Sequence, residues 1–239
     1  NTEVALKFRK MGCRSSSRRG VVESRRSMDM LERIQWFGHG SFALDVQPRI
    51  FINPRRIPRT DQPADLILLS HDHHDHFSPA DVEKLCHDKT IIVGNDRIAR
   101  QLPRTQVLRP WQSLPLGPAC GKALPAYSPR DPRHSLEDGG LGFVISVSFF
   151  DIYYAGDTQI IPEMQRIKPD IALLPIDGRG TLTVTEAGEV TRMIRPKWVI
   201  PYNWGASVSG ATRMDAQRLT REVGDAASVV LPDAIAAAK

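Results

Sequence analysis

Four of the chain's seven histidines fall within six consecutive positions, in the stretch LLSHDHHDHFSPADVEKL at residues 68–85. They are His71, His73, His74 and His76, and aspartates are interleaved with them. An imidazole or a carboxylate is costly to bury without a partner, so a run placed directly after the apolar stretch DLILLS needs either full solvent exposure or a shared partner. A metal ion is the obvious candidate for that partner.

The neighbouring residues place this run in a loop between a strand and a helix. DLILLS is typical of a buried strand, and SPADVEKLCHD after the run is typical of a helix. In that helix Ser78 is suited to the N-cap, Pro79 to the first turn, and Asp81 has the spacing of a capping box.

The spacing of the run suggests two neighbouring ions. In an extended segment, side chains at i and i+2 project to the same side, so His71 and His73 can converge on one ion. Asp75 and His76 can then reach a second ion. Two ions about 3.5–4 Å apart can polarise a substrate oxygen and generate hydroxide at neutral pH.

The rest of the chain predicts two strand-rich halves. Residues 32–54 predict a meander of short antiparallel strands, and residues 90–102 continue as a strand and a helix. Strands return between residues 122 and 156, and helices then alternate with strands up to residue 232. Two such halves with added helices indicate two sheets packed face to face and covered by helices outside.

Composition excludes several classes of protein. Hydrophobic content of 41% and charged content of 25% are typical of a globular chain, and no apolar run approaches the roughly 18 residues of a membrane span. The three cysteines, Cys13, Cys86 and Cys120, are too few and too scattered for a disulfide framework, so a reduced, cytoplasmic setting is expected.

The net charge of +5 comes from one end of the chain. Residues 1–30 carry eight Lys or Arg against three Asp or Glu, whereas residues 31–239 carry 24 of each. We therefore expect a basic, disordered extension at 1–30 and one domain at 31–239. The balanced charge of that domain speaks against nucleic acid as its partner.

Several ordered motifs resemble those of the metallo-β-lactamase superfamily, particularly its branch with ascorbate-6-phosphate lactonase and related metal-dependent hydrolases. The resemblance covers about residues 32–205 and is carried by WFGHGSF, SHDHHDHF, PRH before a GFV strand, YYAGDT, ALLPI and VIPYNWG. It implies an α/β fold, a four-layer αββα sandwich with a metal centre at one edge.

The resemblance also implies a set of ligands for one or two divalent ions. Carried over by motif, the first ion would be held by His71, His73 and His134, and the second by Asp75, His76 and Asp157. Asp157 would bridge the two ions. Zn is expected at the first position.

One residue departs from the pattern of the family. Members of the superfamily supply a last histidine after the strand that corresponds to VIPYNWG, where this chain has Asn203. An amide oxygen is a weaker and harder ligand than imidazole, so the second position should favour Mn or Fe, or fill only partly. His39, at a predicted strand end, is a candidate either for substrate contact or for a structural hydrogen bond, and Asp177 lies in a loop that is a candidate for substrate contact.

These observations lead to a hypothesis of metal-dependent hydrolysis, of the lactonase or phosphodiesterase type. Metal-activated hydroxide would attack an ester, lactone or phosphoester of a small molecule, with Asp75 orienting the nucleophile or returning a proton to the leaving group. A metal-binding sensor or scaffold with weakened catalysis is the alternative, and a nuclease is a third. The sequence predicts no membrane partner and leaves a homo-oligomer open.

Overall fold

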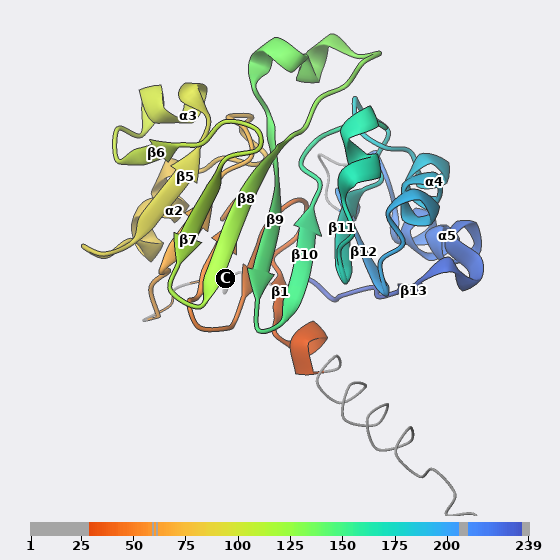
Figure 1. The fold of residues 1–239 in the computed structure, drawn as a ribbon, viewed down its shortest axis with the longest axis horizontal. Coiled ribbons are helices and arrows are strands. Elements are labelled where there is room, and N and C mark those ends of the chain that lie inside the picture. Colours follow the sequence, from red (N-terminus) through yellow and green to blue (C-terminus); the bar gives the residue numbers. More distant parts are fainter. Residues whose placement is uncertain (1–28, 59, 61, 206–209, 236–239) are drawn as a thin grey trace, which may run out of the picture. The chain divides into compact units, whose positions relative to one another are not determined.

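The computed structural model describes residues 29–58, 60, 62–205 and 210–235 (Figure 1). The chain divides between Arg33 and Ile34, and the unit from Ile34 onward holds all the elements below. The basic extension predicted at residues 1–30 lies almost wholly outside the described residues. That boundary therefore stays a prediction.

The first sheet follows the order of the sequence from β1 to β6. Its strands are β1 (Ile34–Trp36), β2 (Phe42–Leu44), β3 (Ile50–Ile52), β4 (Leu66–Leu68), β5 (Ile91–Gly94) and β6 (Thr105–Val107). Strands β1 to β3 are antiparallel, as the meander predicted, and β3 to β6 are parallel. The crossovers are the helices α2 (Pro79–Leu85) and α3 (Asp96–Gln101).

The second sheet has the order β13-β12-β11-β10-β9-β8-β7. Its strands are β7 (Ser113–Leu116), β8 (Ala119–Pro125), β9 (Leu141–Val147), β10 (Phe150–Tyr154), β11 (Ile171–Pro175), β12 (Trp198–Tyr202) and β13 (Ser228–Val229). Strands β7 to β10 are antiparallel and β10 to β13 parallel. The helical elements are η1 (Pro132–His134), η2 (Leu136–Asp138), η3 (Pro162–Arg166), α4 (Val184–Ile194), α5 (Arg213–Val223) and η4 (Gly224–Ala226).

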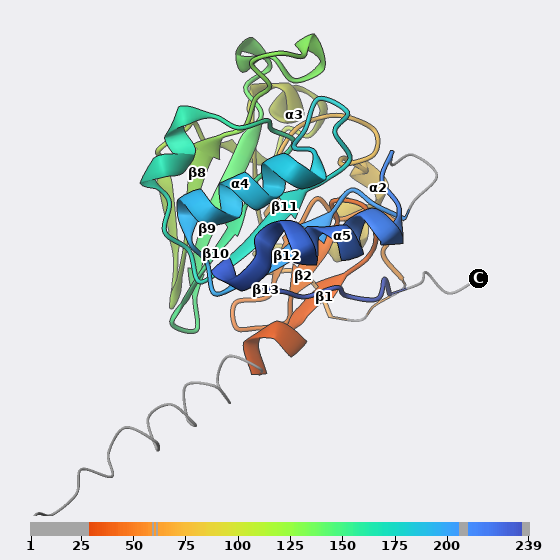
Figure 2. The ribbon, with the colours of Figure 1, turned by 90° about the vertical axis from the view of Figure 1, so that its right-hand side faces the viewer.

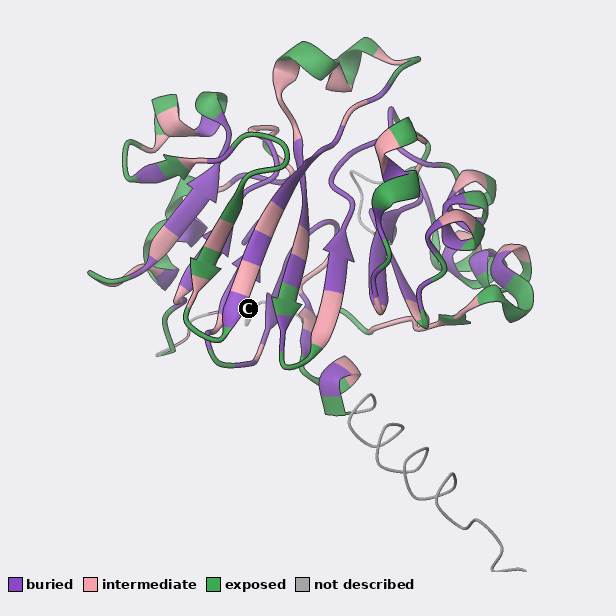
Figure 3. Cartoon of the chain, viewed as in Figure 1, coloured by how far each residue is buried: buried purple, intermediate pink, exposed green. Residues whose placement is uncertain are grey.

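The helices cover the outer faces of the two sheets. In Figure 2, α4 and α5 lie over β11 and β12, with β1 and β2 of the other sheet behind them. The central strands β4 and β11 are buried along their whole length and contain almost only apolar residues, as expected of strands covered on both faces (Figure 3). The predicted αββα sandwich is confirmed.

Helix α2 begins where the sequence predicted, but its capping differs. The Ser78 side chain accepts from the backbone N–H of Asp81, as expected. The Asp81 carboxylate does not return to the cap and instead accepts from the backbone N–H groups of Arg56 and Ile57. Asp81 therefore ties α2 to the loop after β3.

The structure departs from the sequence predictions at one predicted helix and at two strands that the sequence did not indicate. The sequence predicted a helix at residues 161–167, and the structure has only the 3-10 turn η3 there. Strands β6 and β7 have mostly exposed or half-buried side chains, so they lack the apolar pattern that would have indicated them. Among the described residues, no helix is both long enough and apolar enough to cross a membrane.

Candidate metal centre

The candidate site residues predicted from the sequence lie after the carboxyl ends of strands. Within each sheet, these strands all run in the same direction. The histidine run follows β4, and His39 follows β1, which is parallel to β4 through β2 and β3. In the second sheet, His134, Asp157 and Asn203 follow β8, β10 and β12. Ligands commonly bind outside the carboxyl ends of parallel strands, and here this edge collects the polar loops of both sheets.

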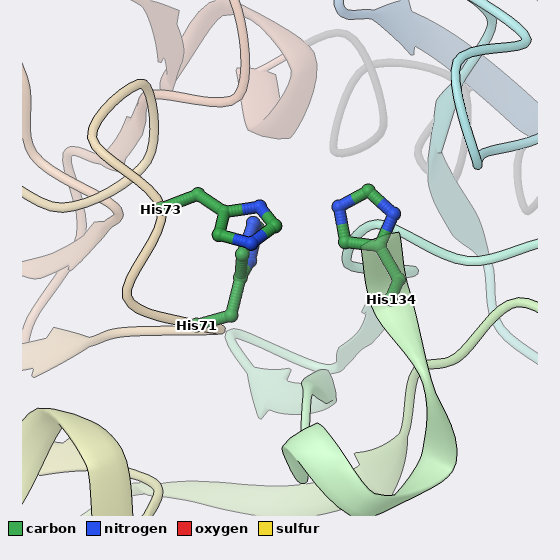
Figure 4. A group of neighbouring side chains, drawn as sticks. All are labelled: His71, His73 and His134. Atoms are coloured by element: carbon green, nitrogen blue, oxygen red, sulfur yellow. The ribbon is translucent and has the colours of Figure 1, made fainter. Parts of the chain in front are cut away.

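Three histidines from two distant segments meet at this edge. The potential ligand atoms of His71, His73 and His134 all lie within 4.8 Å of one another. Figure 4 shows the rings of His71 and His73 on the loop after β4 and the ring of His134 facing them from η1. The sequence separates these residues by about sixty positions, so only the fold brings them together.

Asp157 lies at the middle of the cluster. Its Oδ2 atom is 3.3 Å from Nε2 of His76, 3.4 Å from Nε2 of His134 and 3.8 Å from Nε2 of His71. His71, His76 and Asp157 form a second group with ligand atoms within 4.8 Å, and His39, Asp75 and His76 form a third. His71 belongs to the first and second groups and His76 to the second and third, so the three groups form one continuous centre.

Buried nitrogens in this centre have no hydrogen-bond partner among the described residues. They are the Nε2 atoms of His71, His76 and His134, and Oδ1 of Asn203 is buried without a partner as well. Buried polar atoms are nearly always hydrogen-bonded, so each orphan requires an explanation. Imidazole nitrogens and an amide oxygen gathered around a buried carboxylate are the kinds of ligand that bind a divalent cation.

The tautomer of His134 supports the same conclusion. Its Nδ1 atom lies 3.1 Å from the carbonyl oxygen of Gly180. A carbonyl only accepts hydrogen bonds, so the proton of a neutral ring sits on Nδ1 and the lone pair on Nε2 points at Asp157. Hydrogen bonding of the outer nitrogen commonly fixes a metal-binding histidine in this way. For His71 the outer partner is the Ser70 hydroxyl, 2.9 Å from Nδ1.

Burial and mutual charge shift the pKa values of the centre in opposite directions. Burial, together with the charge of His76, holds the pKa of His71 well below its ordinary value. Burial alone would lower the pKa of His76 and raise that of Asp157, but their attraction outweighs it: the pKa of His76 is raised and that of Asp157 is well below its usual range. Asp157 is therefore an anion at neutral pH.

Asp75 is held as an anion by a neighbouring histidine. Burial alone would raise the pKa of its carboxyl, but the hydrogen bond from His39 and the charge of His76 bring it far below its ordinary value. The bond joins Nε2 of His39 to Oδ2 of Asp75 over 3.1 Å. His39, a candidate for substrate contact from the sequence, and Asp75, a predicted metal ligand, are thus direct neighbours.

Asn203 lies beside Asp157, as its position in the sequence implied. Its Nδ2 atom donates to Oδ1 of Asp157 at 3.0 Å. The residue has a positive φ of 59°, a conformation that Asn tolerates better than most side chains. Tyr202, next to it, donates to the carbonyl oxygen of Gly156 at 2.7 Å, which fixes the turn that presents Asp157.

Asp177 lies near the centre and outside the three groups. Burial and the charge of Asp157 raise the pKa of its carboxyl, and the Thr181 hydroxyl donates to it. His74 is exposed, as the alternation along the loop predicted, and Asp72 accepts from the Gln101 amide at 3.2 Å. Cys86 is half-buried and free, and burial raises the pKa of its thiol.

Sequence reasoning missed the polar network beneath the ligands. Nδ2 of Asn53 lies 2.7 Å from the Ser70 hydroxyl, 2.9 Å from the Tyr154 hydroxyl and 3.1 Å from Nδ1 of His76. The Tyr154 hydroxyl in turn donates to the carbonyl oxygen of Gly40 at 3.1 Å. An Asn before a Pro at the end of a strand reads as a turn residue, so only the fold reveals this role.

A pocket opens beside the first three histidines. Two guanidinium groups line it, and each is paired with an acid: Arg97 with Asp138, and Arg133 with Asp131. The full lining is His71, Asp72, His73, Arg97, Ala126, Arg133, His134, Ser135, Asp138, Gly140, Leu141 and Asp157.

Comparison with known proteins identifies the family of the chain. Residues 33–203 match the family described as "Beta-lactamase superfamily domain". A metal-dependent hydrolase of Pyrococcus abyssi is 27% identical over 223 residues, which are 83% of this chain and 95% of the relative. One from Nitratidesulfovibrio vulgaris is 33% identical over 195 residues, 74% of this chain and 81% of the relative.

Solved structures agree with these relatives. A protein of Parabacteroides distasonis, named as a candidate metal-dependent hydrolase, has a TM-score of 0.72 and 28% identity, covering 83% of this chain and 91% of that one. The metallo hydrolase Igni18 of Ignicoccus hospitalis has a TM-score of 0.69 at 23% identity, covering 84% and 94%, and shows the same fold. The narrower resemblance to the ascorbate-6-phosphate lactonase branch stays a prediction. With the family match spanning residues 33–203 and the fold and histidine cluster in agreement with it, the chain belongs to the beta-lactamase superfamily.

Proposed function

We propose that this protein is a metal-dependent hydrolase that cleaves an ester, lactone or phosphoester bond of a small molecule. The observation that carries the proposal is the set of buried, unpartnered imidazole nitrogens around Oδ2 of Asp157. The names of the relatives support hydrolysis with a metal, and the type of bond is the part that the proposal adds.

The proposed ligands divide between two adjacent positions. His71, His73 and His134 would hold the first ion, and Asp75 and His76 would hold the second, with Asp157 contributing to the centre from beside His71, His76 and His134. Ions bound there would supply Lewis acidity, the chemistry that generates a hydroxide nucleophile at neutral pH and polarises the substrate. Zn suits the three imidazoles of the first position, and Mn or Fe suits the more oxygen-rich second one.

The side chains around the ions position the reactants. Asp75, kept ionised and oriented by His39, can accept a proton from the attacking water or return one to the leaving group. Asp177 would contact substrate, a role supported by its closeness to Asp157 and by the hydrogen bond from Thr181. Gly180 and Ser70 hold the outer nitrogens of His134 and His71 and so keep the rings in place.

The charge of the domain favours a small-molecule substrate. Arg97 and Arg133 line the pocket, but each is already paired with an acid, so they give no preference for an anionic substrate. A polynucleotide is disfavoured because residues 31–239 carry equal numbers of basic and acidic side chains.

The test is a panel of lactones, esters and phosphodiesters, assayed with the metal-loaded protein and with protein stripped by a chelator. We expect metal-dependent turnover of at least one class, lost in the His71→Ala variant. Metal that binds tightly without turnover of any class would contradict the proposal.

A catalytically weakened metal sensor or scaffold is the second candidate. Asn203 favours it, because its amide nitrogen is committed to Asp157 where the family pattern has an imidazole. The same panel separates the two candidates, since a sensor would bind metal and hydrolyse none of the compounds.

A further inference from the structure

The second cation position lacks one of its expected ligands. Asn203 stands where the family pattern has a histidine, and its Nδ2 atom is bonded to Oδ1 of Asp157. A carboxylate only accepts hydrogen bonds, so the amide nitrogen must face Asp157. Asp75, His76 and a share of Asp157 then remain, which is few protein ligands for a stably bound ion.

His39 brings an imidazole to the same place from another strand. Its Nε2 atom is 3.1 Å from Oδ2 of Asp75, and its ring centre is 4.7 Å from that of His76. The ligand atoms of all three residues lie within 4.8 Å of one another. His39 is 4% exposed, so its ring sits inside the centre and not in solvent.

The main chain is built to hold His39 in this position. Its carbonyl oxygen accepts from Nε1 of Trp36 at 2.8 Å and from the backbone N–H of Asn203 at 3.4 Å. Its φ of 49° is in the left-handed region, which a histidine adopts at some cost. Asn203, which stands where the family pattern has a histidine, is thus hydrogen-bonded through the backbone to His39, which brings another imidazole to the site.

The distance between His39 and Asp75 suits two ligands of one ion. Ligand atoms about 2.1 Å from a cation and at right angles around it lie about 3.0 Å apart. Without an ion, the same separation is a hydrogen bond in which Nε2–H of His39 donates to the carboxylate. Binding of a cation would release that proton and leave both atoms in place as neighbouring ligands.

We propose that His39 replaces the missing histidine and holds a second divalent transition-metal ion together with Asp75, His76 and Asp157. The inference rests on the proposed metal centre. Two imidazoles and two carboxylates suit Mn, Fe or Zn. The unpartnered Oδ1 of Asn203 is the competing ligand, and the experiment separates the two.

The test measures metal content per chain by elemental analysis after loading and removal of free metal. We expect two ions in the natural protein and in Asn203→Ala, but one ion in His39→Ala. We also expect one ion in His39→Gln, whose amide restores a donor to Asp75 without an imidazole. His71→Ala should lose the first ion, which shows whether the centre itself exists.

Each contrary result has its own meaning. Two ions in His39→Ala with one in Asn203→Ala would assign the position to the Asn203 amide and overturn the inference. If His39→Gln binds two ions at natural affinity, His39 is only a hydrogen-bond donor to Asp75 and the inference is overturned. If the natural protein binds a single ion, the second cation site does not exist and the inference is overturned as well. That last result leaves the proposed function intact if the remaining ion depends on His71.

A measurement on the natural protein avoids any loss of folding in the variants. Loaded with Co²⁺, the protein should show hyperfine-shifted ring resonances from five histidines: His39, His71, His73, His76 and His134. Shifted signals from only the last four would overturn the inference.

Discussion

A methyl group added at Gly40 should disturb the metal centre without removing any ligand. A Cβ atom at this position would lie 2.4 Å from Cε1 and 2.6 Å from Nδ1 of His76, and 2.8 Å from the Tyr154 hydroxyl. Ordinary contacts between carbon atoms are about 3.5–4.0 Å, so the His76 ring must move by about 1 Å in Gly40→Ala. The ring has little room, because Asn53 and Asp157 contact its two nitrogens.

The expected cost is both structural and functional. Overpacking of a buried site costs about 1–3 kcal/mol, which in a chain of this size lowers the melting temperature by several degrees. Displacing His76 from Asp157 should also weaken the second ion about 10- to 100-fold, as loss of a supporting contact does at other metal sites. Thermal unfolding followed by circular dichroism, and metal titration by calorimetry, measure the two effects.

Gly121 offers a matched control. It lies in β8, and a Cβ there would meet no atom within 4 Å. Gly121→Ala should therefore leave metal binding unchanged and stabilise the fold by at most about 1 kcal/mol, because the added Cβ meets no atom and alanine loses less backbone entropy in a strand than glycine. Natural stability and natural metal affinity in Gly40→Ala would refute the packing described around His76.

Three further predictions follow from the same contacts. Replacing His71 or His73 with Ala should remove most of the bound metal, measured by elemental analysis, and retained metal in both variants would overturn the ligand assignment. Asn203→His should tighten binding of the second ion, because an imidazole replaces an amide that is bonded to Asp157; unchanged affinity in a metal titration would count against this position as a metal site. Burial alone would raise the pKa of the Asp81 carboxyl, but its hydrogen bonds with Lys84, Ser78 and Arg56 lower it. The ionised carboxylate therefore stabilises the fold at pH values above the pKa of the unfolded chain. This stabilisation is lost as the pH falls through the lower pKa of the folded state. Asp81→Asn should cost about 1–3 kcal/mol in urea unfolding at pH 7, with a gap to the natural protein that narrows in acid, and a gap that is constant with pH would contradict the role of the charge.

The sequence predicted the parts of the centre that depend on local pattern. The apolar run before His71 and the cap at Ser78 placed the histidines in a strand-to-helix loop, and the structure has that loop. The alternation of strands and helices predicted two covered sheets because each element must bury one face. His134 and Asp157 came from resemblance alone, since a lone histidine in a loop carries no signal of its own.

The contacts between distant segments could not be predicted from local pattern. Asn53 and Tyr154 are 101 positions apart, and their hydrogen bond depends on how the two sheets pack. The Gly180 carbonyl that orients His134 is 46 positions from it. Strands β6 and β7 were missed because their side chains are too exposed to show an apolar period.

A crystal structure of the zinc-loaded protein, with anomalous scattering recorded at the zinc edge, tests the central claim most directly. We predict an anomalous peak about 2.0–2.1 Å from a ring nitrogen of each of His71, His73 and His134, with Asp157 beside it. The absence of a peak at these three histidines after loading would contradict the account, whether or not zinc binds elsewhere.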